Sequence, residues 1–167
     1  PDIMTFAKGV TSAAVPMGGA MVGRHVYEAF QSGPDHMIDL FHGYTYSGHP
    51  LAMAAALATF ELYREEGLFE QARANEAAFA DAAFTLKGHP LVLDIRTIGM
   101  VAAFDLAPVE GLMGKRGYDA MCNAFHEQNI MVRVSGDTIA FSPPLIIEEA
   151  QMGELFERFK KALDAVA

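Results

Sequence analysis

The chain has 167 residues, of which 51% are hydrophobic and 20% charged, so it can bury a core without a metal or disulfide staple. Its 12 basic and 21 acidic residues give a net charge of -9, and no basic cluster is present that could neutralise the phosphates of a nucleic acid. Cys122 is the only cysteine, which excludes an internal disulfide framework. We expect a cytoplasmic protein of one or two domains without a nucleic-acid partner.

The first third of the sequence predicts two short strands and two helices. Residues 3–6 and 19–23 have the pattern of short buried strands, and residues 24–30 that of a short surface helix. A longer helix is predicted over residues 50–67, with Pro50 in its first turn and Gly67 at its end. Its first three turns are apolar all round, so we expect that half to be buried between domains or subunits.

The remainder of the sequence predicts helices packed on a small, mostly antiparallel sheet. The predicted elements, in chain order, are a helix at 68–87, strands at 91–98 and 100–106, a helix at 118–128, a hairpin of strands 130–134 and 138–142, and a helix over 148–166. We place the domain boundary near residue 65, which gives domains at 1–65 and 66–167.

One uncharged stretch raises the question of a membrane span. Residues 40–60 carry no charge, but their first half contains two histidines, a proline and several hydroxyl-bearing side chains. The chain also begins "PDIMTFAKG" rather than with a basic segment followed by an apolar one, as a signal peptide would. We expect neither a membrane span nor a signal peptide.

Lys8 is the single charged residue of the stretch "TFAKGVTSAAVPMGGAMVG". One interpretation is a solvated lysine that closes a strand, since lysines are mostly exposed. The other is a lysine in a dry pocket, where loss of solvation lowers the amine's pKa and makes it a nucleophile able to form a Schiff base. A reactive lysine so near the beginning needs pocket walls from another chain or from sequence absent here, and we expect this sequence to be a fragment.

Three segments decide between these interpretations. Together "PDIMTFAKG", "FHGYTYSGHPLA" and "VRVSGDTIAFSPPLI" resemble the C-terminal part of class III, or omega-amino acid:pyruvate, aminotransferases, and the resemblance extends over essentially the whole chain. It implies an α/β fold of fold-type I, comprising the end of the large domain and the small C-terminal domain. It also implies the cofactor pyridoxal 5'-phosphate.

The resemblance gives three residues a role. Lys8 would hold the cofactor as a Schiff base and then act as the base that moves a proton. The glycine-rich stretch after it would leave room beside the planar cofactor ring. Thr45, just before a predicted helix, would bind the cofactor phosphate of the neighbouring subunit, which implies a homodimer with shared sites. Arg133, opposite in orientation to Val132 and Val134, would clamp the substrate carboxylate.

Each role has a plainer alternative. Thr45 and Ser47 could simply cap the following helix, and Arg133 could be a surface arginine at a hairpin end. His42 and His49 lack a third ligand at a persuasive spacing, so we expect no metal site. Tyr44 and Tyr46 line either the dimer contact or the pocket.

The expected activity is transfer of an amino group from an amine or an omega-amino acid such as beta-alanine to a keto acid such as pyruvate. Relatives supply other cofactor contacts from chain upstream of the lysine, so the 167 residues alone are expected to be inactive. Two alternatives are open: a noncatalytic folding or dimerisation module from a truncated chain, and a related aminomutase or decarboxylase.

Overall fold

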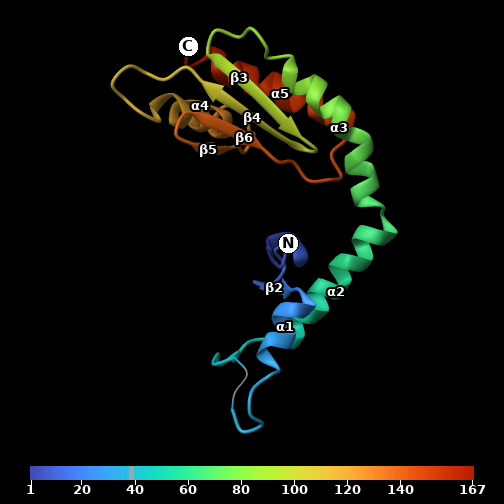
Figure 1. Cartoon of the computed structure of the whole chain (residues 1–167). Helices are drawn as coiled ribbons and strands as arrows, with labels where there is room; N and C mark the ends of the chain where they lie inside the picture. The colour runs from blue at the N-terminus through green and yellow to red at the C-terminus, as the bar shows by residue number, and fades with distance from the viewer. Residues whose placement is uncertain (38–39) are drawn as a thin grey trace. The chain divides into compact units, whose positions relative to one another are not determined.

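The computed structural model describes residues 1–37 and 40–167. It divides into two compact units, Pro1–Gly67 and Leu68–Ala167, and each is described by itself (Figure 1). The sequence places this division near residue 65.

The first unit begins with a two-stranded antiparallel sheet. Strand β1 (Ile3–Ala7) pairs with β2 (Gly18–Val22), and the 3-10 turn η1 (Lys8–Val10) leaves the end of β1. Both strands lie where the sequence predicts them, but their predicted burial is wrong for this chain, because most of their residues are exposed. A two-stranded ribbon has no further strand to cover its side chains.

Two helices complete the first unit. Helix α1 spans Arg24–Phe30 and helix α2 spans Pro50–Glu65, close to their predicted bounds. The residues of α2 that are buried form a narrow stripe of small side chains, Ala52, Ala56 and Thr59. Its large apolar residues are open, with Leu51 67% and Leu57 64% exposed. Burial of this half of the helix against another domain or subunit is therefore still a prediction.

The second unit is a four-stranded antiparallel sheet with three helices. Its sheet has the strand order β3-β4-β6-β5. The elements are α3 (Leu68–Phe84), β3 (Val92–Ile98), β4 (Val101–Leu106), α4 (Lys115–His126), β5 (Arg133–Ser135), β6 (Thr138–Phe141) and α5 (Glu149–Asp164). The mostly antiparallel sheet expected from the sequence is confirmed, although both strands of the predicted hairpin are shorter than expected.

An aromatic core joins the helices to one face of this sheet. Along β4 the buried residues alternate, so that Phe104 faces inward while its neighbours face outward. Its ring lies 5.2 Å from that of Phe159 and 5.8 Å from that of Phe156, both on α5. Fully burying such side chains contributes about 1.5–3 kcal/mol each to stability. Phe141 of β6 joins the same cluster, with its ring 4.8 Å from that of Phe159, so the core packs both β4 and β6 against α5.

Candidate functional site

Lys8 lies in a turn and has a left-handed backbone conformation, which few residues other than glycine adopt. Its φ is +55°, and Ser12 and Ala13 also have positive φ values of 49° and 63°. Each non-glycine residue in this left-handed region costs on the order of 1 kcal/mol or more, so surrounding bonds must hold it. The Lys8 carbonyl accepts hydrogen bonds from the N–H groups of Thr11, at 3.2 Å, and Ala13, at 3.4 Å.

The turn is also anchored by two side chains. Thr11 is 1% exposed, and its hydroxyl donates to the carbonyl of Val15 at 2.7 Å. From helix α2, the Tyr63 hydroxyl donates to the carbonyl of Gly9 at 2.8 Å. Sequence reasoning missed Tyr63, because no local signal relates a helix residue to a turn that lies 54 positions earlier.

The amine of Lys8 has no ion-pair partner within residues 1–37 and 40–167, and the residue is exposed. The dry pocket expected around it is therefore not formed by the described residues. The room expected beside the glycine-rich stretch is also partly filled. A Cβ at Gly19 would lie 2.5 Å from the ring of Phe6, which faces it across the sheet.

Thr45 lines a hollow of about 900 Å³ between the chain after the Lys8 turn and the start of α2. Its walls are residues 15–18, 42–49, 52 and 53. At one wall Tyr44 has a φ of +50°, and its N–H donates to Nδ1 of His42 at 3.0 Å. Lys8 is not among the wall residues that the structure describes, so Lys8 and Thr45 do not share this hollow.

The first turn of α2 lies at the same hollow. Its N-cap residue is His49, and no side chain makes a capping hydrogen bond there. The interpretation that Thr45 and Ser47 cap this helix is therefore wrong. The first N–H groups of a helix and the positive end of its dipole favour an anion. Thr45, which lines the same hollow, adds a hydroxyl that can donate.

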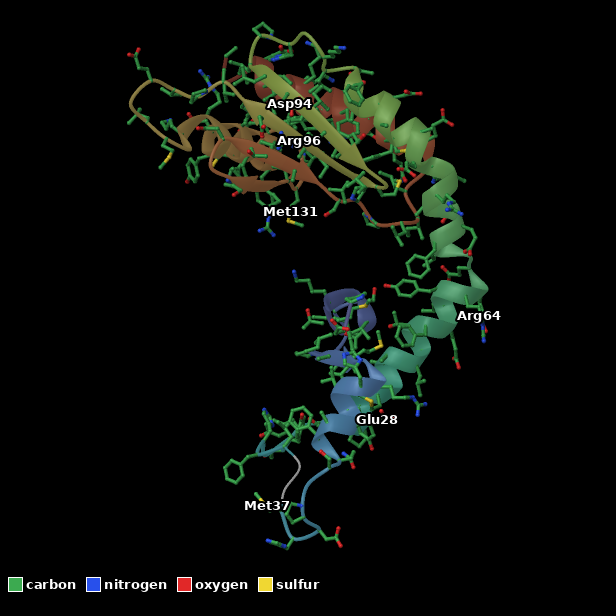
Figure 2. The ribbon with its side chains drawn as sticks, viewed as in Figure 1. Glu28, Met37, Arg64, Asp94, Arg96 and Met131 are labelled. Carbon is green, nitrogen blue, oxygen red and sulfur yellow. The ribbon has the colours of Figure 1, made fainter. Side chains whose placement is uncertain are left out.

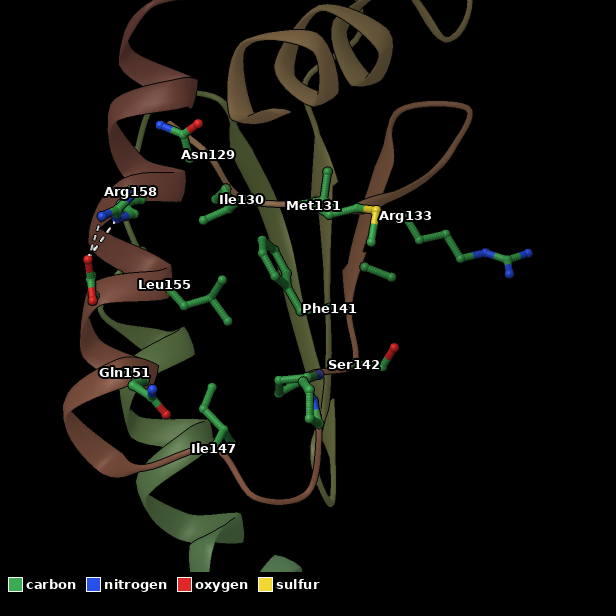
Figure 3. A pocket seen from close by; sticks show the side chains of 15 residues that line it. Asn129, Ile130, Met131, Arg133, Phe141, Ser142, Ile147, Gln151, Leu155 and Arg158 are labelled. Carbon is green, nitrogen blue, oxygen red and sulfur yellow. Dashed lines mark hydrogen bonds and ion pairs between the residues drawn. The ribbon is translucent and has the colours of Figure 1, made fainter. Parts of the chain in front are cut away.

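Arg133 is the first residue of β5 and lies opposite Ala140 of β6. It is exposed while Val132 and Val134 are half-buried, which confirms the predicted alternation. Figure 3 shows its side chain directed away from Leu155 and Phe141, at the edge of a hollow of about 780 Å³. Within the described residues its guanidinium has no carboxylate partner, whereas Arg158 in the same hollow bonds to Glu154 at 2.6 Å.

The hairpin that carries Arg133 is fixed by Asp137. The two carboxylate oxygens of Asp137 accept hydrogen bonds from the N–H groups of Gly114 and Gly117, each at 3.0 Å. These bonds start α4 at Lys115, three residues before the predicted Tyr118. The glycine pair three residues apart was the available signal for this close approach, and sequence reasoning did not use it.

An exposed polar network crosses the same sheet. Arg96 of β3 contacts Asp94 of the same strand at 2.8 Å (Figure 2). It also pairs with both oxygens of Asp105, whose Oδ1 accepts a bond from the Thr138 hydroxyl at 2.8 Å. The Arg96 hydrogen bond, followed by that from Thr138, lowers the pKa of Asp105 below its ordinary value. This network ties β3, β4 and β6 together.

The described residues offer neither a metal site nor a membrane span. No cluster of three His, Cys, Asp or Glu side chains could hold a metal ion there. None of the helices in that part of the chain has the length and apolar character needed to cross a membrane. Lys8 and Thr45 belong to the first unit and Arg133 to the second.

Comparison with known proteins identifies the family. The sequence model described as "Aminotransferase class-III" matches residues 1–163, so the chain belongs to the class-III aminotransferase family. Over 166 residues it is 43% identical to the omega-aminotransferase of Caulobacter vibrioides, covering 99% of this chain and 38% of that protein. It is 37% identical to the putrescine–pyruvate aminotransferase of Pseudomonas aeruginosa, covering 100% of this chain and 37% of that protein.

Solved structures of transaminases are also similar to this chain. The omega transaminase from Pseudomonas jessenii, in complex with PMP, matches with a TM-score of 0.88 and 34% identity. The match covers 99% of this chain and 38% of that one. The predicted α/β fold of these transferases is thus confirmed. The chain spans less than two fifths of the length of the relatives named here.

Proposed function

We propose that this chain forms the C-terminal part of a pyridoxal-phosphate-dependent transaminase. The whole enzyme would move an amino group from an amine or an omega-amino acid to a keto acid such as pyruvate. Relatives named for putrescine and for beta-alanine, each with pyruvate, support this substrate class. In this proposal residues 1–67 end the large cofactor-binding domain, and residues 68–167 form the small domain.

The observation that carries the proposal is the conformation of Lys8. Lys8 follows a strand and has a strained, left-handed backbone, and two hydrogen bonds to its carbonyl close the turn. A solvated surface lysine does not require such a conformation. Strain of this kind concentrates at functional sites because it fixes the direction of a side chain. An amine without a carboxylate partner is also available to react with a carbonyl group.

The residues present fit pyridoxal phosphate by the chemistry of their donors. The cofactor has a carbonyl group, which an amine such as that of Lys8 attacks, and a phosphate, which the Thr45 hydroxyl and the uncapped first turn of α2 suit. When bound, pyridoxal phosphate acts as an electron sink that stabilises negative charge on the substrate carbon.

The chain's own residues then have separate tasks. Lys8 would attach the cofactor through Nζ, and the released Nζ would be the base that moves a proton between the substrate carbon and the cofactor. Arg133 receives the substrate carboxylate in a bidentate pair. Since neither task needs the other's side chain, positioning and proton transfer are divided between two residues.

The second subunit follows from Thr45. Because Thr45 and Lys8 line different parts of the first unit, we propose that Thr45 binds the phosphate held at the partner subunit's lysine. The exposed apolar side chains of α2, among them Leu51, Leu57 and Phe60, would then be covered in part by the partner in a homodimer. Such a face loses its contact with water on association, which favours the dimer.

The test uses the full-length enzyme that carries this chain. Borohydride treatment followed by peptide mass spectrometry should find the reduced cofactor on the peptide with Lys8, and Lys8→Ala should abolish both this mass and transamination. Lys87→Ala, which removes another exposed lysine, is the matched control and should leave both unchanged. Transfer at the wild-type rate by Lys8→Ala would overturn the proposal.

A further inference from the structure

Helix α2 reaches the Lys8 turn through one phenol. Tyr63 lies in the last turns of α2, is half-buried, and its Oη donates to the carbonyl oxygen of Gly9 at 2.8 Å. A Cβ added to Gly9 would lie 3.4 Å from the same hydroxyl, so the phenol rests directly against the turn's backbone. This bond joins two segments that are 54 residues apart.

The carbonyl that Tyr63 contacts belongs to Gly9, the residue after Lys8. Gly9 also accepts a hydrogen bond from the N–H of Ser12 at 3.3 Å, so its carbonyl receives one donor from the turn and one from α2. Tyr63 thereby restrains the Gly9–Val10 peptide plane, which is the second plane after the left-handed residue Lys8. The bonds to the Lys8 carbonyl, by contrast, come from within the turn itself.

Release of that plane would change where the amine points. The direction of the Lys8 side chain follows from its φ and ψ, and a lysine gains free energy by leaving the left-handed region. Without a donor from α2, the turn has less to oppose this relaxation. A displacement of about 1 Å of a reacting group can lower a rate by about a hundredfold.

We propose that Tyr63 is a positioning residue that holds the Lys8 turn in its left-handed conformation. The inference rests on the proposed role of Lys8 and adds a residue outside the three segments that resemble the family. Tyr63 acts through the Gly9 carbonyl and the turn, so its removal should alter the placement of the amine.

The experiment compares Tyr63→Phe with Tyr27→Phe in the full-length protein. Both changes delete one phenolic hydroxyl, and Tyr27 is 57% exposed on α1, so it serves as the matched control. Hydrogen exchange followed by mass spectrometry is measured on cofactor-free protein. For Tyr63→Phe, the amides of residues 11–13 should exchange about two- to tenfold faster, the scale of one neutral hydrogen bond. Tyr27→Phe should leave them unchanged.

A second readout concerns the amine. The rate at which borohydride fixes added cofactor on the Lys8 peptide should fall about two- to tenfold in Tyr63→Phe, and kcat should fall more than KM rises. Unchanged exchange of residues 11–13, or faster exchange with unchanged trapping, would overturn the positioning role. If the exchange of β4 amides became faster by the same factor, the variant would be generally destabilised, and the positioning role would be overturned as well.

Failure of the wider proposal would look different. If Lys8 does not hold the cofactor, Lys8→Ala remains active and no cofactor mass is found on its peptide, whatever Tyr63→Phe does to exchange. If Lys8 holds the cofactor and Tyr63 does not position it, Lys8→Ala is inactive while Tyr63→Phe traps cofactor at the wild-type rate.

Discussion

Replacement of Arg133 by alanine separates substrate binding from chemistry. Arg133 is exposed on β5, and within the described part of the chain no carboxylate pairs with its guanidinium. The whole fork of N–H donors is therefore available to a substrate carboxylate. Ala140 lies opposite it across the strands and makes no polar contact that would be lost.

The expected magnitude follows from this geometry. A hydrogen bond to a charged group contributes about 1.5–3 kcal/mol, and no internal partner of Arg133 offsets its loss. Arg133→Ala in the full-length enzyme should therefore lower the specificity constant for beta-alanine, alanine or pyruvate by roughly ten- to a hundredfold. A simple alkylamine has no carboxylate, so its own half-reaction should change little.

Single-turnover absorbance measures each half-reaction alone, so a slow keto-acid half cannot hide the result. Arg73→Ala, which removes an exposed arginine from α3, is the control and should affect neither donor. Equal losses for beta-alanine and the alkylamine would refute the reasoning. They would mean that Arg133 supports the fold or the cofactor rather than the substrate's carboxylate.

Three further predictions concern the small unit that carries Arg133. Asp137→Ala should lower the free energy of unfolding by about 1–3 kcal/mol, because two N–H groups at the start of α4 lose their acceptor; an unchanged urea midpoint would contradict this. Gly117→Ala should cost about 3 kcal/mol, since a Cβ would collide with a hairpin carbonyl, whereas Gly153→Ala meets open space and should not destabilise α5 in thermal melts. The lowered pKa of Asp105 means that its pairing with Arg96 stabilises the fold above the ordinary aspartate pKa and is lost as pH falls through the lowered value. Melting temperatures of wild type and Asp105→Asn should therefore converge with acidification, and parallel curves would exclude this contribution.

Much of the secondary structure was predictable because its causes are local. The predicted helix over residues 24–30 coincides with α1, and Pro50 marks the first turn of α2. On β4 and β6, alternation of buried and more exposed residues follows from the twofold period of a strand. In each case a few neighbouring residues decide the outcome, so a short window of sequence is enough.

The errors come from contacts between distant residues. The start of α4 was placed too late because the carboxylate that accepts bonds from its first N–H groups belongs to Asp137, which follows the helix in sequence. Burial of the strands near Lys8 was overestimated because composition describes a side chain's preference and not whether another element covers it. The left-handed φ of Lys8 has no sequence signal, since non-glycine residues seldom adopt it.

The two proposed cationic groups are held by the same physical arrangement. Lys8 lies in a tight turn bonded to Tyr63 of α2, and Arg133 precedes a tight turn whose Asp137 bonds to the start of α4. In both, the cation itself makes no bond within the described residues, while a neighbour in its turn is fixed to a helix distant in sequence. A long side chain with a fixed base and a free end loses less conformational freedom when it meets a ligand than one on a mobile loop. Tyr63 and Asp137 are therefore the residues that fix the two turns. Their substitution should impair the placement of the Lys8 and Arg133 side chains without removing either charge.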